Sequence, residues 1–147
     1  MVDLCHGNID MTVGRSTSPT HQIGQKAEDV ALIFLQQKGF QLVAQNYHCK
    51  MGELDLVVAQ DQLLVFVEVR QRKLSVFGNA AASITLSKQR KIIKTSAFFL
   101  QSFPEFEAYD CRYDVIAIDS WGRKSLGAGH ENITIDWIDG AFDTSAL

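Results

Sequence analysis

The sequence has few cysteines and no long apolar run, and both absences narrow the possible classes of protein. Its three cysteines, Cys5, Cys49 and Cys111, are widely separated and form no Cys-x-x-Cys pair. An odd number of scattered cysteines favours free thiols in a reducing cytosol over a secreted disulfide framework. No stretch approaches the roughly 20 apolar residues that cross a bilayer, and the N-terminus has no apolar signal-peptide core. We therefore expect a soluble, cytoplasmic protein with no membrane partner.

The sequence also lacks the short motifs of several enzyme classes. It contains no P-loop and no Gly-x-Ser-x-Gly nucleophile turn. His48 and Cys49 are neighbours in a predicted strand, so their side chains face opposite ways and do not form a shared zinc site. These absences disfavour nucleotide-triphosphate, serine-hydrolase and zinc chemistry.

Charge is distributed unevenly along a chain of ordinary composition. The 147 residues are 46% hydrophobic and 21% charged, with a net charge of −3, which is typical of one globular domain and argues against binding of nucleic acid by bulk positive charge. Between residues 70 and 94, however, seven basic residues and no acids occur: Arg70, Arg72, Lys73, Lys88, Arg90, Lys91 and Lys94. Such a run indicates either a local phosphate-binding surface or a solvated helix face with a loop.

Hydrophobic periodicity divides the chain into a short extension and one domain. Residues 1–19 are polar and show no sustained period, so we expect a flexible N-terminal extension followed by a single domain over residues 20–147. Helices are expected over about 20–38 and 86–100, and strands over 40–48, 53–60, 63–70, 111–119 and 133–138. This order predicts a mixed α/β domain.

The second predicted helix has a capping signal and an apolar stripe. Thr85 or Ser87 would cap its N-terminus. The residues at helical spacing that should be buried are Ile92, Ile93, Ser96, Ala97 and Leu100.

The predicted hairpin over residues 53–70 brings two acids together. If Asp61-Gln62 forms a two-residue turn, counting outward places Asp55 directly opposite Glu68. Opposed side chains have Cβ atoms roughly 4.5–5.5 Å apart, so like charges there repel. The rest of this strand face is apolar, which indicates that another element covers it. A divalent cation would hold the two carboxylates together, since Mg²⁺ sites use one or two carboxylates plus water and phosphate.

A second interpretation of the hairpin needs no metal. The acids would lie at a solvated strand end, where Arg70 neutralises Glu53 across the pair. Asp-Gln is also a weak signal for a two-residue turn, and a slip of one residue would remove the opposition of the acids.

Several short motifs carry a family resemblance. In chain order they are Gly24-Gln25-Lys26-Ala27-Glu28, Lys38-Gly39-Phe40, Gly52-Glu53-Leu54-Asp55-Leu56, Phe66-Val67-Glu68-Val69-Arg70, Lys88-Gln89-Arg90-Lys91, residues 112–118 and residues 137–142. Together they resemble the YraN family of bacterial proteins over nearly everything after Thr20. The resemblance implies a restriction-endonuclease-like α/β fold, with a mixed five-stranded central sheet flanked by helices. It also implies membership of the PD-(D/E)xK nuclease superfamily, near the archaeal Holliday-junction resolvases.

The resemblance further implies roles for the hairpin. Asp55 matches the aspartate of the PD motif, and Glu68-Val69-Arg70 matches the (D/E)xK segment. Asp55, Glu68 and the carbonyl of Val69 would then bind Mg²⁺ or Mn²⁺ in a catalytic site to which Arg70 also belongs.

Two further residues match site positions of the family. Glu28 looks like the additional acid of resolvase-like members, where it would orient water or help to hold a second ion; alternatively, it is an acid favoured by the helix dipole. Gln89 resembles the family's glutamine near the active face; alternatively, it is a polar surface residue.

The chain departs from the pattern at two positions. Arg70 occupies the place of the catalytic lysine, and because arginine keeps its proton it cannot act as a general base, although it could stabilise charge on phosphoryl oxygens. Relatives carry either residue there. Ala27 replaces the glycine that usually precedes the helix acid, which should favour the helix.

The function implied by the resemblance is metal-dependent phosphodiester hydrolysis of DNA, particularly branched or structured DNA. Basic residues would follow the backbone by charge: Arg70, Arg72, Lys73, Lys88, Arg90 and Lys91. A resolvase cuts at two sites and would require a homodimer. The alternatives are a non-catalytic module on the same fold, which binds nucleic acid or a protein partner, and a purely structural role.

Overall fold

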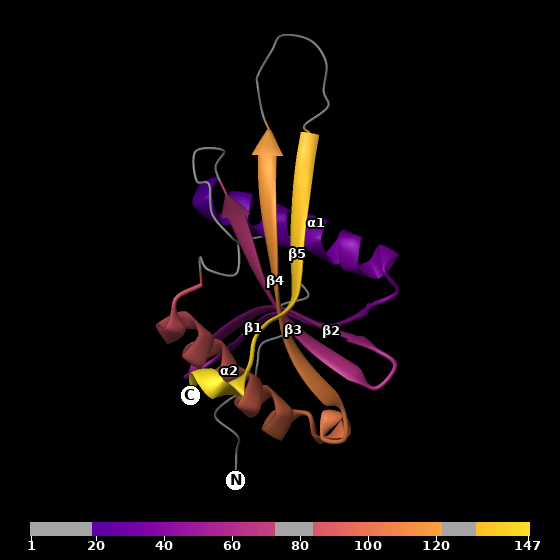
Figure 1. Ribbon diagram of the computed structural model, residues 1–147, viewed down its shortest axis with the longest axis vertical. Helices are drawn as coiled ribbons and strands as arrows, with labels where there is room; N and C mark the ends of the chain where they lie inside the picture. Colours follow the sequence, from indigo (N-terminus) through magenta and orange to yellow (C-terminus); the bar gives the residue numbers. More distant parts are fainter. Residues whose placement is uncertain (1–18, 73–83, 122–131) are drawn as a thin grey trace.

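A five-stranded sheet lies between two long helices (Figure 1). The computed structural model describes residues 19–72, 84–121 and 132–147, and the side chains of 27–72, 84–119 and 133–147. In chain order the elements are α1 (Pro19–Gln37), β1 (Gln41–Cys49), β2 (Gly52–Gln60), β3 (Leu63–Arg72), α2 (Leu86–Ser102), the 3₁₀ turn η2 (Pro104–Phe106), β4 (Asp110–Trp121), β5 (Asn132–Phe142) and the 3₁₀ turn η3 (Thr144–Ala146). The predicted α/β class, with a mixed five-stranded sheet flanked by helices, is confirmed.

The strands lie in the sheet in chain order, β1-β2-β3-β4-β5. The β3–β4 pair is parallel, and the other three pairs are antiparallel. Parallel neighbours need a long crossover connection, and the segment that contains α2 provides it here. This topology brings the end of β3 and the beginning of α2 to the same side of the molecule as the beginning of α1 (Figure 1).

The turn between β2 and β3 has the length that the sequence predicted. Gln60 pairs with Leu63, so Asp61 and Gln62 form a two-residue loop. Asp61 adopts a positive φ of 53°, a conformation that two-residue hairpin turns require and that aspartate tolerates. The hairpin register is therefore the predicted one, without a slip.

One hydrophobic core lies between α1 and the sheet. From α1 it takes Ala27, Ala31 and Leu35, which follow one another at four-residue spacing on a single helix face. The buried residues of this core are Ala27, Ala31, Leu35, Phe40, Leu56, Val58, Val65, Val67, Ile116 and Ile118. The small alanines let α1 lie close to the sheet.

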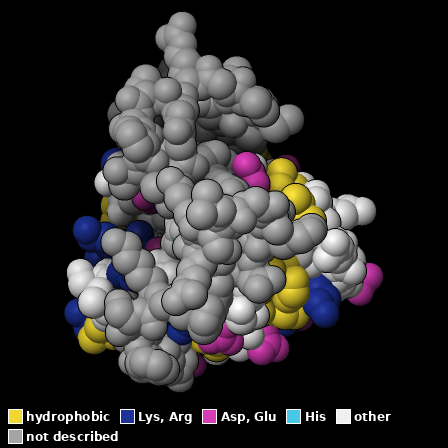
Figure 2. All heavy atoms as spheres, turned by 90° about the horizontal axis from the view of Figure 1, so that it is seen from above, with side chains coloured by type: hydrophobic (Ala, Val, Ile, Leu, Met, Phe, Trp, Pro, Cys, Tyr) yellow, Lys and Arg dark blue, Asp and Glu magenta, His cyan; other side chains and the backbone are white. Residues whose placement is uncertain are grey.

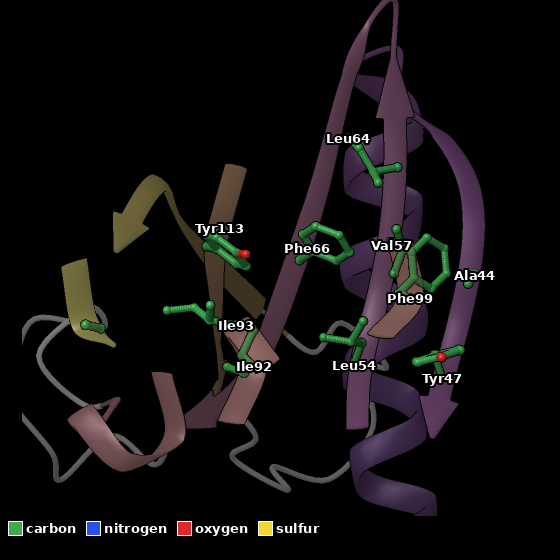
Figure 3. Close-up of a cluster of buried hydrophobic side chains, with 11 residues drawn as sticks. Ala44, Tyr47, Leu54, Val57, Leu64, Phe66, Ile92, Ile93, Phe99 and Tyr113 are labelled. Carbon is green, nitrogen blue, oxygen red and sulfur yellow. The ribbon is translucent and has the colours of Figure 1, made fainter. Parts of the chain in front are cut away.

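A second core lies between α2 and the other face of the sheet (Figure 3). Phe66 contacts both Phe99 and Tyr113, at ring-centroid distances of 5.9 and 5.5 Å. The buried residues of this core are Ala44, Tyr47, Leu54, Val57, Leu64, Phe66, Ile92, Ile93, Phe99, Tyr113 and Ala146.

The predicted stripe of α2 is confirmed in part. Ile92, Ile93 and Ser96 are buried, but Ala97 is exposed and Leu100 only half-buried. Thr95 and Phe99 are buried in their place, because the helix turns a slightly different face to the sheet. Thr85 is the residue that caps α2, since its hydroxyl accepts a hydrogen bond from the Lys88 amide at 3.2 Å.

Strand alternation is broken near the site. Leu54 should share a face with Leu56, yet it packs in the α2-side core together with Val57. The β1–β2 register places Asn46 opposite Asp55, and Asn46 has a φ of 53° that no regular strand contains. Leu54, which pairs with Tyr47, therefore departs from simple strand alternation next to the irregular residue Asn46.

Two sequence predictions concern the ends of the chain and membranes. The expected flexible extension lies almost wholly outside the described residues. Within the described part of the chain, no helix is long and apolar enough to cross a membrane.

Candidate functional site

Asp55 and Glu68 meet where the regular β2–β3 ladder ends. The last regular pair joins Leu56 to Val67, so the two acids occupy the next positions outward. The Val69 amide donates a hydrogen bond of 2.9 Å to Asp55 Oδ2, and the side chains of Asp55 and Glu68 are hydrogen-bonded to each other. A hydrogen bond between two carboxyl groups requires a proton on one of them. The structure therefore brings the two predicted acids together, just beyond the last regular pair of the hairpin.

Burial raises the pKa of both acids. Glu68 is only 7% exposed, and burial followed by the nearby Asp55 raises its pKa to about 8. Burial also raises the pKa of Asp55, whereas the Val69 amide, which donates to the ionised carboxylate, and the hydrogen bond with Glu68 lower it. The two acids are therefore coupled, and burial disfavours two negative charges on the pair at once.

Glu28 brings a third acid to this end of the sheet from α1. Burial, and then the negative charge of Asp55, raises the pKa of Glu28 to about 7, while a hydrogen bond with Asn46 opposes the shift. Its Oε2 atom is buried and has no hydrogen-bond partner among the described residues. Glu28 therefore lies next to buried Ala27 on α1, close enough to Asp55 for the charge of Asp55 to raise its pKa.

Lys88, in the first turn of α2, contacts the acid pair. Its Nζ lies 3.6 Å from Glu68 Oε1, and its side chain is about one-third exposed. The sequence suggested Lys88 only as a backbone-contact residue and did not connect it with Glu68. The signal was present: Lys88 lies one helical turn before buried Ile92, and residues four apart share a helix face.

Arg70 follows on β3 and is half-buried. Its charge favours the ionised form of Glu68, but less strongly than the charge of Lys88 does. Glu53, which the sequence paired with Arg70, instead has its Oε2 atom 3.3 Å from Nδ1 of His48 on β1, and both side chains are exposed to solvent. Arg70 is thus a cation beside the acid pair rather than a proton acceptor.

Gln89 lies on a different side of α2 from Lys88. Its Nε2 donates to the carbonyl of Ile84 at 3.1 Å, and Ile84 is buried against β4 residues. This contact fixes the segment that leads into α2. The structure gives Gln89 a local supporting contact and does not connect it with the acids.

The predicted basic surface separates into exposed and engaged residues. Arg72 binds both carboxylate oxygens of Asp119 at 3.1 Å and also lies 3.5 Å from Asp136. Arg90 donates to the Ala146 carbonyl at 2.7 Å. Lys91 is exposed, whereas Lys73 lies outside the described residues. Figure 2 shows Lys and Arg side chains among acidic ones at the left, where α1 and α2 begin and β3 ends.

The donor atoms of the site suit a hard divalent cation. Asp55 and Glu68 offer carboxylate oxygens, and Val69 adds a backbone carbonyl at the same position of the strand. Within the described ranges, no three acidic, histidine or cysteine side chains form a ready metal-binding group. Mg²⁺ needs only one or two carboxylates when water and phosphate complete its shell, so the residues fit such an ion.

Comparisons with known proteins place this site inside the segment that a family profile matches. The profile of "Uncharacterised protein family UPF0102" matches residues 27–118, which include Glu28, Asp55, Glu68 and Lys88. A UPF0102 protein of Psychrobacter cryohalolentis is 46% identical over 148 residues, covering 88% of this chain and 85% of the relative. A relative from Psychrobacter sp. is 44% identical and covers 85% of this chain. A relative from Acinetobacter baylyi is 40% identical and covers 83% of this chain. Each match spans 90% of the length of the relative.

Proposed function

The chain belongs to the UPF0102 family, and we propose that it is a metal-dependent nuclease of the PD-(D/E)xK type, which hydrolyses phosphodiester bonds in structured DNA. The observation that carries the proposal is the geometry of two acids: half-buried Asp55, held by the Val69 amide, lies beside buried Glu68, and Lys88 lies 3.6 Å from Glu68. Two neighbouring carboxyl groups in a largely buried place destabilise the fold, so such a pair indicates a functional site. The family resemblance of the motifs around the pair supports the same reaction.

A divalent cation would be held by Asp55, Glu68 and the Val69 carbonyl. These are oxygen donors, and Mg²⁺ and Mn²⁺ prefer oxygen. When bound, such an ion offsets negative charge on a phosphodiester and makes water more nucleophilic at neutral pH. The Val69 amide keeps the Asp55 carboxylate fixed on β3, so the donors are oriented before any ion arrives.

Glu28 is the best-placed proton acceptor. A general base works best when its pKa is close to the working pH, and that of Glu28 is raised to about 7. Its buried Oε2 has no hydrogen-bond partner among the described residues and can accept a proton from water. Arg70 remains charged throughout and would stabilise negative charge on the phosphoryl oxygens.

Exposed basic side chains would hold the DNA backbone. Lys91 is free to approach phosphates, since it lies on the exposed face of α2. Contacts of this kind position DNA without reading its sequence, which favours recognition of shape. A junction substrate cut on two strands would need two copies of the site, and therefore a homodimer.

Arg70 favours a second candidate function. Because arginine cannot accept a proton, its place on β3 also suits a non-catalytic module that binds structured nucleic acid or a protein partner. Cleavage separates the two functions, since the module would bind DNA and leave it intact.

The test is cleavage of labelled four-way-junction, duplex and single-stranded DNA with Mg²⁺ or Mn²⁺. We expect the wild type to cut the junction, and Asp55→Asn and Glu68→Gln to lose at least about a hundredfold in rate, as expected when a metal ligand is removed. Glu105→Gln is the matched control, because Glu105 is an exposed acid in η2, away from the site. Binding without cleavage would favour the non-catalytic module, and neither binding nor cleavage would overturn both.

A further inference from the structure

Lys88 occupies an unfavourable place for a cation on its own helix. The positive end of the helix dipole lies at the N-terminus, and α2 has no acid in its first turn to offset Lys88. Thr85 caps the helix by accepting from the Lys88 amide, so the backbone of Lys88 is fixed. The compensation comes from across the sheet, where Glu68 Oε1 lies 3.6 Å from Lys88 Nζ. This ion pair ties α2 to β3.

The partner of Lys88 is also a proposed metal ligand. Glu68 is 7% exposed, so it has little room for two cations at once. A divalent cation on the Glu68 carboxylate would repel the ammonium, since charges this close in a protein interact strongly. Lys88 is about one-third exposed, so its long side chain can turn away without a change in the fold.

We propose that Lys88 is a two-position lysine, which binds Glu68 in the cation-free site and turns to the DNA phosphate once Glu68 holds a divalent cation. It would thereby supply, from α2, the ammonium group that position 70 lacks. This inference rests on the proposed function for its ligand, a DNA phosphate, but not on turnover. It makes the contribution of Lys88 to DNA binding conditional on the cation.

The proposal predicts when Lys88 affects the affinity for DNA. Without a cation its charge is committed to Glu68, so Lys88→Met should change the dissociation constant for a DNA junction by less than about twofold. With Ca²⁺ or Mn²⁺ the same variant should bind the junction about tenfold more weakly, the usual size of one charge-assisted contact. Lys91→Met should weaken binding in both conditions, because Lys91 is an exposed residue of α2. Lys38→Met, at the far end of α1, is the off-site control.

A second variant tests the same exchange without metal. Glu68→Gln removes the partner of Lys88, so Lys88 should contact DNA even in EDTA. Adding Lys88→Met to Glu68→Gln should then cost about tenfold in affinity, although it costs the metal-free wild type almost nothing. The single variant Glu68→Gln and the double variant both lack the Glu68 carboxylate, so the loss of its negative charge does not affect the difference between them.

The measurement is fluorescence anisotropy of a labelled junction, with thermal melts to show that each variant is folded and gels to count only intact DNA. A cation-dependent loss in Lys88→Met and the non-additive double variant support the proposal. Equal losses with and without cation would make Lys88 an ordinary surface contact and overturn it, as would no loss in either condition. If the wild type binds but never cuts, the nuclease proposal fails while these comparisons still decide the role of Lys88.

Discussion

The Val69 amide donates to Asp55 Oδ2 at 2.9 Å, and this bond joins β3 to β2 beyond their last regular pair. At this point a side-chain oxygen of Asp55, and not a backbone carbonyl of β2, accepts the hydrogen bond from the β3 backbone. The carboxylate is therefore held by the same strand that carries Glu68, and the distance between the acids does not depend on a bound ion. The fold itself assembles the site.

Replacing Asp55 should stabilise the cation-free protein and abolish its response to cations. Asp55→Asn keeps an oxygen for the Val69 amide but removes a half-buried carboxylate, the pKa of which is raised by desolvation. We expect a gain of about 1 kcal/mol in the free energy of unfolding at pH 8. Mn²⁺ should raise the melting temperature of the wild type but not of Asp55→Asn. Asp110→Asn, an exposed acid on β4, is the control; a stabilising Mn²⁺ response in Asp55→Asn would contradict the ligand assignment.

The stability of the cation-free protein should fall as the pH rises from 5.5 to 9. The folded pKa values of Glu28 and Glu68, about 7 and about 8, lie above the ordinary 4.5, so the folded protein retains protons that the unfolded chain has released. Their stabilising contribution is complete below pH 4.5 and is lost as the pH rises through 7 and 8. We expect the melting temperature to fall by about 5 °C over this range.

Glu68→Gln should reduce the fall of the melting temperature around pH 8, because it removes the group that titrates there. Glu28→Gln should reduce the fall around pH 7 for the same reason. Both variants keep the size of the side chain and remove its titration. Differential scanning calorimetry in EDTA gives the profiles. A wild-type melting temperature that rises steadily to pH 9 would show that the acids are not protonated in the folded state.

The sequence predicted the hairpin well because its determinants are local. Alternation of apolar residues and the length of the Asp61-Gln62 turn are enough to place Asp55 opposite Glu68. The face of Leu54 was not predictable in this way, since it depends on the positive φ of Asn46 on the neighbouring strand. Local periodicity contains no information about a distortion in another strand.

The roles of the basic residues could not be predicted from charge alone. Arg72 and Lys91 belong to the same basic run in the sequence, yet Arg72 is paired with Asp119 and Lys91 is exposed. Asp119 lies in β4, far from Arg72 in the sequence, and the parallel pairing of β3 with β4 brings the two residues together. Contacts between distant segments decide which cations face solvent, and the family resemblance does not specify them for Lys88 either.

Asp114 should be a major stabilising residue outside the site. It is fully buried and accepts hydrogen bonds from Arg112 Nε at 2.8 Å, Trp137 Nε1 at 3.0 Å and the Gly140 amide at 3.0 Å. This network ties β5 to β4. Asp114→Ala leaves these donors unpaired and should cost about 3–5 kcal/mol in urea denaturation. A loss as small as that of the exposed Asp110→Ala would contradict the network's importance.

Arg72 and Lys91 should separate stability from DNA affinity. Arg72 is 17% exposed and holds Asp119 and Asp136, so Arg72→Met leaves two acids beside one another and should destabilise the protein by about 1–3 kcal/mol. Lys91→Met should leave the unfolding free energy within about 0.5 kcal/mol, as is usual for exposed substitutions, and reduce the salt dependence of DNA binding by about one ion. Urea titrations and binding isotherms at several salt concentrations measure the two effects. If Arg72→Met instead weakened DNA binding with no loss of stability, the ion pairs with Asp119 and Asp136 would have to open in the complex. The DNA-binding surface would then extend from α2 across the end of β3.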